Sequence, residues 1–204
     1  YDRHCLVDHF FQPNTNIENF SSCNYKELGD FVKGAYSCDT KKGKGAVDIL
    51  LKREGLINGN PFLVDKKINL SKTGSKIEVT YKILNSGKET GSFIFAPEFN
   101  FTLPKADSDE YKIVFDGKEQ IHMKDCLEVK QKKVVSFVEK LEIEIITVSL
   151  SENVDIWSFP VSTVSQSEKA YELNYQSSCV VPLFQVLLNP GEEKTISLAI
   201  EQGK

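Results

Sequence analysis

The segment IEVTYKI, Ile77–Ile83, alternates apolar and polar residues without a break. Its apolar residues Ile77, Val79, Tyr81 and Ile83 share one parity, and the polar residues between them share the other. A period of two is typical of a β-strand that turns one face to a core and the other to water. The segment therefore predicts a half-buried β-strand.

The same alternation recurs elsewhere, with two irregularities. Phe93, Phe95, Phe99, Phe101 and Leu103 share one parity, but Pro97 interrupts them. Because proline has no N–H to donate, we expect this strand to lie at a sheet edge or to be bulged at that residue. The segment from Leu141 to Ile145 also alternates, and its apolar phase then slips by one residue. One extra residue moves every later side chain to the opposite face, so we predict a bulge near Ile146.

Other short apolar segments extend this pattern along the chain. Further strands are predicted at residues 47–51, 63–70, 111–115, 127–129, 134–138, 154–159, 171–175, 180–188 and 195–200. Turn residues separate them, and Asp116-Gly117 is a candidate two-residue hairpin loop. Helical signals are limited to Tyr25–Val32, where Asn24 is a candidate N-cap. Ten or more strands predict an all-β chain, a large antiparallel two-sheet β-sandwich formed by residues 1–204 as a single domain.

Composition excludes several function classes. The chain has 204 residues, of which 40% are hydrophobic, and its net charge is −4 with scattered lysines. A mildly acidic chain lacks the basic surface that nucleic-acid binding requires. No apolar run approaches the roughly 20 residues that span a bilayer. We therefore expect neither a nucleic acid nor a membrane as partner.

The five cysteines, Cys5, Cys23, Cys38, Cys126 and Cys179, are irregularly spaced. Without a C-x-x-C pair or a Cys/His cluster, no zinc site is expected, and the sequence shows no phosphate-binding glycine loop. We expect free thiols and a reducing compartment, the cytoplasm, with one Cys23–Cys38 disulfide as the alternative. The chain opens on Tyr1 rather than Met, and we interpret it as part of a longer polypeptide.

Two segments have a more specific character. YDRHCLVDHFF (residues 1–11) contains Leu6-Val7-Asp8-His9-Phe10, and WSFPVSTVSQSE (residues 157–168) is followed by Tyr175-Gln176. GDFVKGAY (29–36) and LLKREGLI (50–57) lie between them. Together these segments resemble the C-terminal β-domain of glycoside hydrolase family 57, the α-amylases and 4-α-glucanotransferases of thermophiles.

The resemblance implies a fold and a place in a larger enzyme. It implies the galactose-mutarotase-like supersandwich, and a catalytic (β/α) barrel upstream as partner in the same polypeptide. A retaining glycosidase needs two carboxyl groups about 5–5.5 Å apart. In the family these belong to the barrel, and no residue of this chain matches the barrel motifs. We therefore expect no catalytic residue, no cofactor and no metal here, and α-glucan is a possible ligand.

The polar stretch from Phe159 to Gln176 contains most of the candidate sugar contacts. It is either a connection between strands or a surface that binds something polar. Trp157 before it can stack on a pyranose ring, or it can fill the core. Gln166 and Glu168 can hydrogen-bond vicinal hydroxyls, or they can hold a loop or contact the barrel. Tyr171, Tyr175 and Gln176 are further candidates, although the shared parity of Tyr171 and Tyr175 also suits a core face.

Histidines are the remaining candidates for chemistry. A hexose mutarotase uses a general acid and a general base around the ring, and His122 is one such candidate. Asp8-His9 is better explained as a hydrogen-bonded tie between the N-terminal segment and its neighbour. Two alternatives to the glucan-enzyme domain therefore stay open: a free-standing mutarotase-like aldose epimerase, and an interaction domain without a ligand.

Overall fold

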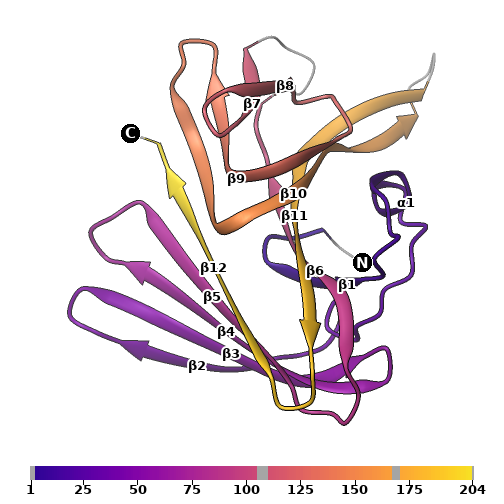
Figure 1. Cartoon of the computed structure of the whole chain (residues 1–204). Helices are drawn as coiled ribbons and strands as arrows, with labels where there is room; N and C mark the ends of the chain where they lie inside the picture. The colour runs from indigo at the N-terminus through magenta and orange to yellow at the C-terminus, as the bar shows by residue number, and fades with distance from the viewer. Residues whose placement is uncertain (1–2, 105–109, 167–170, 204) are drawn as a thin grey trace.

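The computed structural model describes residues 3–104, 110–166 and 171–203. These contain twelve β-strands and one short helix (Figure 1). In chain order they are β1 (Val7–Phe11), α1 (Ile17–Ser21), β2 (Ser37–Lys42), β3 (Ala46–Ile57), β4 (Asn60–Ser71), β5 (Lys76–Asn85), β6 (Gly91–Phe101), β7 (Tyr111–Phe115), β8 (Glu119–His122), β9 (Leu127–Glu139), β10 (Glu144–Gln166), β11 (Tyr171–Leu188) and β12 (Glu193–Gln202). Within the described ranges, no helix is long and apolar enough to cross a membrane.

All strand pairs are antiparallel, and the sheet runs in the order β1-β6-β11-β10-β12-β5-β4-β3-β2. The long strand β10 joins the parts of the sheet. One of its edges pairs with β12 near the start of β10 and with β11 from Asp155 onward, and the other edge pairs with β9 between Glu144 and Ser158. The strands β2 to β5 with β12 fan out on one side, and β1, β6 and β11 lie across from them (Figure 1). This arrangement confirms the prediction of a large antiparallel β-sandwich.

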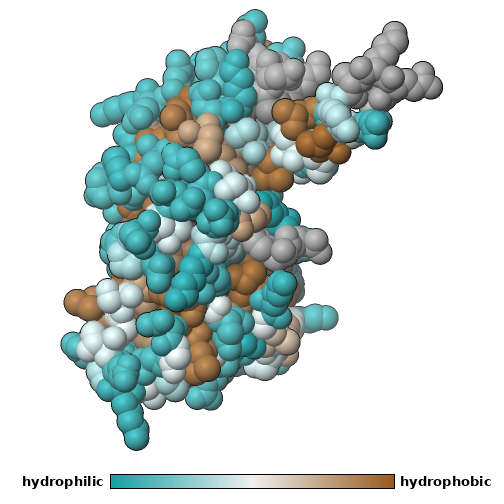
Figure 2. Space-filling view, turned by 90° about the vertical axis from the view of Figure 1, so that its right-hand side faces the viewer, coloured by the Kyte–Doolittle hydropathy of each residue, from teal (hydrophilic) through white to brown (hydrophobic). Residues whose placement is uncertain are grey.

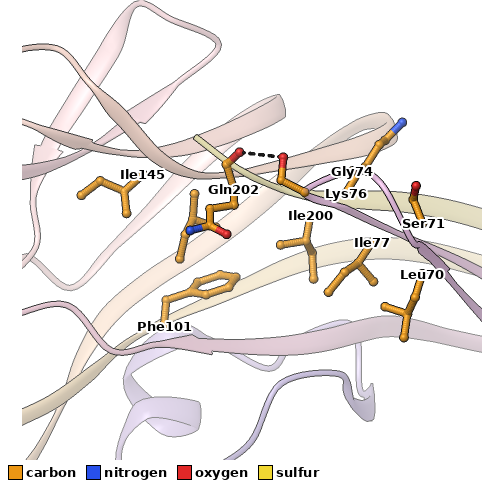
Figure 3. Close-up of a pocket in the computed structure, with 11 residues that line it drawn as sticks. Leu70, Ser71, Gly74, Lys76, Ile77, Phe101, Ile145, Ile200 and Gln202 are labelled. Atoms are coloured by element: carbon orange, nitrogen blue, oxygen red, sulfur yellow. Dashed lines mark hydrogen bonds between the residues drawn. The ribbon is translucent and has the colours of Figure 1, made fainter. Parts of the chain in front are cut away.

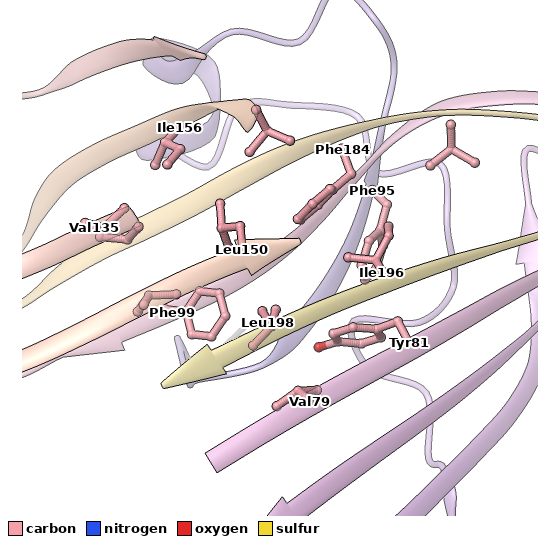
Figure 4. Packing of buried hydrophobic residues seen from close by; sticks show 14 of the residues in the cluster. Val79, Tyr81, Phe95, Phe99, Val135, Leu150, Ile156, Phe184, Ile196 and Leu198 are labelled. Carbon is pink, nitrogen blue, oxygen red and sulfur yellow. The ribbon is translucent and has the colours of Figure 1, made fainter. Parts of the chain in front are cut away.

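The main core fills the space between these two groups of strands. Val79, Tyr81 and Ile83 of β5 are fully buried, as their parity predicts, and belong to the same apolar cluster as Phe95 and Phe184. Figure 4 shows Tyr81 directed toward Phe95. The Tyr81 and Phe95 rings meet edge to face with centroids 4.9 Å apart, a favoured aromatic geometry. The alternation in IEVTYKI therefore reports directly on the inner face of the sheet.

A second apolar cluster covers the opposite face of β1, β6, β10 and β11. Ile17 and Phe20 of α1 pack there against Trp157, Phe159 and Val181. Strands that are buried on both faces have continuous apolar runs, which explains why Cys179–Phe184 shows no alternation. The predicted helix at Tyr25–Val32 is wrong, because the helix lies at Ile17–Ser21. There the Asn16 side chain accepts a hydrogen bond from the Asn19 N–H as N-cap.

The expectation that Pro97 marks a sheet edge or a bulge is also wrong, since β6 lies between β1 and β11 and keeps the same register with β11 on both sides of Pro97. Pro97 pairs with Asp8 of β1. On the other side, pairing with β11 is interrupted between Phe95↔Phe184 and Phe99↔Val180, and this register places Pro182 opposite Pro97. Two residues that cannot donate face each other, so neither strand leaves an N–H unpaired at this point.

The predicted bulge near Ile146 is confirmed by a register shift between Glu144 and Ile146. The predicted strand before it is not, since β10 begins at Glu144 and Leu141 is 75% exposed. Asp116-Gly117 forms part of a three-residue loop, because Phe115 pairs with Glu119. The two-residue loop occurs instead at Asn58-Gly59, where φ is 50° and 82°, as a hairpin turn of this length requires.

Candidate functional site

Strand β1 carries a buried ionic group on its inner face. Asp8 Oδ2 lies 2.7 Å from Lys66 Nζ and accepts a hydrogen bond of 2.6 Å from the Tyr36 hydroxyl. Lys66 Nζ also donates to the Leu6 carbonyl at 2.8 Å, and both charged side chains are at most 5% exposed. Burial, followed by the charge of Asp8, raises the pKa of Tyr36, so its phenol stays protonated as a donor.

The opposite face of β1 holds a second ionic group around His9. Nδ1 lies 2.8 Å from Glu27 Oε2, and Nε2 lies 2.9 Å from Glu98 Oε2. Glu98 is fully buried and also binds Arg3 at 3.2 Å and the Asn100 amide at 2.6 Å. Because a carboxylate only accepts hydrogen bonds, both ring nitrogens must donate, which requires a charged imidazolium.

Opposing influences act on the pKa of His9. Burial lowers it, and the hydrogen bonds and charges of Glu27 and Glu98 outweigh burial, so the pKa is raised. The Glu27 carboxylate also accepts from the Phe10 N–H at 2.6 Å. The interpretation of Asp8-His9 as a hydrogen-bonded tie for the N-terminal segment is thus confirmed.

The stretch from Phe159 to Gln176 is mostly the paired ends of β10 and β11. A register shift between Val161 and Ser162 separates the buried part of this hairpin from its outer part. Beyond it, the described residues 162–166 and 171–174 are all exposed. We call these residues the arm. It projects away from the rest of the molecule (Figures 1 and 2), so the stretch is neither a plain loop nor part of the body.

The arm has two chemically different faces. Val164 lies opposite Leu173, and Gln166 lies opposite Tyr171, on one face. Their apolar members are 64% (Val164), 77% (Leu173) and 75% (Tyr171) exposed. On the other face the Asn174 amide donates to Ser165 Oγ at 2.6 Å. The Gln176 amide likewise donates to Thr163 Oγ1 at 3.1 Å. One face is therefore apolar and open, and the other is polar and bonded to itself.

The sequence allowed Trp157 either to stack on a sugar or to fill the core, and in the structure it lies in the core. It is 1% exposed, stacks on Phe11 with centroids 5.6 Å apart, and donates from Nε1 to Glu128 at 2.7 Å. An indole enclosed in this way presents no ring face to a sugar. It also lies nine residues before Gln166 in one strand, a span of about 30 Å. The structure does not bring these two candidates together.

The remaining candidates scatter. Tyr175 is half-buried against the main core, and its hydroxyl lies 2.9 Å from Ser178 Oγ. Glu168 falls outside the described residues. His122 is exposed at the end of β8. Among the candidates that the structure describes, only Gln166 and Tyr171 face each other across the hairpin in the open. The five cysteines are free.

One hollow lies at the open end of the sandwich (Figure 3). It has a volume of about 440 Å³, and more of its lining is apolar than polar. The apolar residues are Leu70, Ile77, Phe101, Ile145, Ile146 and Ile200, and the polar ones are Ser71, Ser75, Lys76 and Gln202. The Ser75 hydroxyl closes one side by donating to the Gln202 carbonyl at 3.2 Å. Sugar sites combine an apolar surface with convergent hydrogen-bonding groups. This largely aliphatic lining therefore suits a sugar less well than the Gln166–Tyr171 pair does.

Comparison with known proteins places the chain in a family. Residues 1–198 match the family profile described as "Alpha-amylase/4-alpha-glucanotransferase, C-terminal". The chain belongs to this family. Its curated relatives include a 4-alpha-glucanotransferase of Thermococcus kodakarensis, 26% identical over 189 residues. An alpha-amylase of Pyrococcus furiosus is 31% identical over 185 residues.

The match spans nearly all of this C-terminal domain but only part of each relative. It covers 91% of the chain and 25% of the Thermococcus protein, and 90% and 24% for the Pyrococcus protein. The crystal structure of the 4-alpha-glucanotransferase from Thermococcus litoralis superimposes with a TM-score of 0.72 at 24% identity. That superposition covers 99% of this chain and 28% of the other.

The fold of this C-terminal domain also occurs in another class of protein. A putative aldose 1-epimerase from Escherichia coli K12 aligns with a TM-score of 0.58 at 14% identity, over 98% of this chain and 80% of that one. At this identity the likeness concerns the fold alone. It supports the supersandwich architecture that the family resemblance implied.

Proposed function

We propose that this chain is the single, non-catalytic β-sandwich domain of an enzyme that hydrolyses or transfers α-1,4-glucan. Its task is to brace a catalytic barrel that precedes it in the same polypeptide. The observation that carries the proposal is the family match over residues 1–198, in a chain that spans about a quarter of its relatives. Free cysteines are consistent with a cytoplasmic enzyme.

The anchoring of β1 supports this role. Two buried ionic groups fix Asp8 and His9 within a few residues of Arg3, the first described residue. A domain that braces its neighbour must hold the connecting chain in one place. Glu98 and Lys66, which hold it here, belong to β6 and β4, so the junction is tied to both sides of the sandwich.

The test compares three proteins: the 204-residue chain, the polypeptide extended upstream of Tyr1, and that extension without residues 1–204. We expect the extended polypeptide to turn over maltoheptaose and the chain alone to release no product. Removing residues 1–204 is expected to lower the activity or its thermal half-life. Turnover of maltoheptaose by the chain alone would refute the proposal. Faster optical-rotation decay of fresh α-glucose would favour the epimerase instead.

A second candidate function, direct glucan contact, is favoured by the exposed Tyr171 ring beside Gln166. If a sugar stacks there, millimolar maltoheptaose is expected to shift the backbone amide signals of both residues in an NMR titration. Because Tyr171→Ala removes the apolar ring surface on which the sugar would stack, it is expected to weaken binding severalfold. Leu187→Ala, at a residue 69% exposed elsewhere on β11, is the matched control. Unchanged spectra at millimolar glucan would leave only the bracing role.

A further inference from the structure

We infer that the apolar face of the arm, formed by Val164, Leu173 and Tyr171, is the surface on which the preceding domain of the same polypeptide docks. The inference rests on the proposed function and adds to it the place of contact. It concerns the described parts of the arm alone, residues 162–166 and 171–174.

The arm is a two-stranded hairpin with one apolar face, which is the construction expected of a segment that packs on another surface. A two-stranded hairpin without a third strand or a covering layer is marginally stable in water. In the arm, side chains of the polar face hydrogen-bond to one another, Asn174 to Ser165 and Gln176 to Thr163. The apolar residues gather on the other face, where Val164 and Leu173 are directly opposed. Antiparallel ribbons of this type bury the apolar face and leave the polar face in water.

The exposure is concentrated rather than scattered. Val164, Leu173 and Tyr171 are all at least 64% exposed, and all lie within one short section of the hairpin. Single exposed apolar residues are ordinary, whereas a contiguous group marks a binding surface. Figure 2 shows hydrophobic surface on the projecting arm. The neighbouring part of the hairpin, from Ser177 to Val180, is buried, so the exposure begins where the arm leaves the body.

The position of the N-terminal segment identifies the occupant. The Arg3 guanidinium lies 5.1 Å from the centroid of the Phe159 ring and 4.9 Å from that of Phe20. Phe159 precedes the register shift at which the arm begins. Arg3, the first described residue, therefore lies beside the base of the arm. The relatives are about four times as long as this chain. The part of them that this chain does not cover is large enough to extend from the base of the arm along its apolar face.

The test uses hydrogen–deuterium exchange of residues 162–166 and 171–174. It compares the extended polypeptide with the 204-residue chain. Docking is expected to slow exchange of these amides by about tenfold or more in the extended polypeptide, because local opening must first separate the domains. Leu173→Lys is expected to abolish this difference. The control Glu172→Lys adds the same side chain at an exposed position one residue away, on the other face, and is expected to preserve it.

Both substitutions lie at exposed residues, so thermal unfolding of the 204-residue chain is expected to stay unchanged and serves as the folding control. Equal exchange in the two wild-type proteins would overturn docking. If the extended polypeptide still turned over maltoheptaose, the proposed function would stand without this surface. Protection of the arm by maltoheptaose in the chain alone would assign it to glucan. Protection that rises with chain concentration would assign it to a second copy. Either result overturns the inference.

Discussion

Lys66→Met is expected to lower the free energy of unfolding of the 204-residue chain by about 3–5 kcal/mol. The substitution removes the cation from a pair in which Lys66 is 5% and Asp8 1% exposed at the side chain. The Asp8 carboxylate then stays buried without its cation, although it still accepts a hydrogen bond from the Tyr36 hydroxyl. A lone buried charge costs more than the pair contributes, so the loss reflects the stranded carboxylate. Urea unfolding at pH 7 measures it.

The adjacent residue supplies the control. Lys67 pairs with Asp48 at 3.1 Å on the outer face, where the two side chains are 50% and 28% exposed. Lys67→Met is expected to cost less than about 1 kcal/mol, because exposed ion pairs contribute little. The double variant Asp8→Leu with Lys66→Met removes both charges and is expected to recover much of the loss. Equal effects of Lys66→Met and Lys67→Met would contradict this account of the site.

Residues that alternate along one strand could be predicted well, because the alternation records a single physical fact, the burial of one sheet face. Val79, Tyr81 and Ile83 needed no knowledge of their partners. Pro97 could not be placed in the same way. Its interior position depends on Pro182, 85 positions later in the sequence, and on the uninterrupted pairing with β1. The rule that proline favours edge strands considers one strand at a time. It therefore could not predict that Pro97 and Pro182 lie opposite each other, where the pairing of β6 with β11 is interrupted.

The candidate site shows the same limit more sharply. Asp8-His9 could be predicted as a tie because of its motif, but its partners could not. Lys66 and Glu98 lie 58 and 89 positions from the residues they bind, and Lys66 resembles a surface lysine in a strand of ordinary parity. Trp157 lies in the core because α1, which the sequence did not indicate at residues 17–21, packs against it. The arm could be recognised as polar, yet its apolar face appears only when β10 and β11 are paired in register.

Stability is also expected to depend on pH through His9. In the folded chain its pKa is raised, because the hydrogen bonds to Glu27 and Glu98 more than offset burial. In the unfolded chain it titrates at about 6.5. A raised folded pKa gives a contribution that is complete below about pH 6.5 and is lost as the pH rises through the folded pKa. The free energy of unfolding is therefore expected to fall on going from neutral to alkaline pH.

His9→Gln isolates this contribution, since glutamine retains a donor but no titrating group. At pH 6 the variant is expected to be less stable than the wild type by about 2–4 kcal/mol, because Glu98 is left buried with a weaker partner. As the pH rises the two free energies are expected to converge, by at most about 1.4 kcal/mol per pH unit. Subtracting the free energy of unfolding of the variant from that of the wild type cancels the contributions of the thiols and lysines, which titrate in both proteins. Parallel profiles for wild type and His9→Gln would show that folding does not raise the pKa of His9, contrary to the effect expected from its two carboxylate partners.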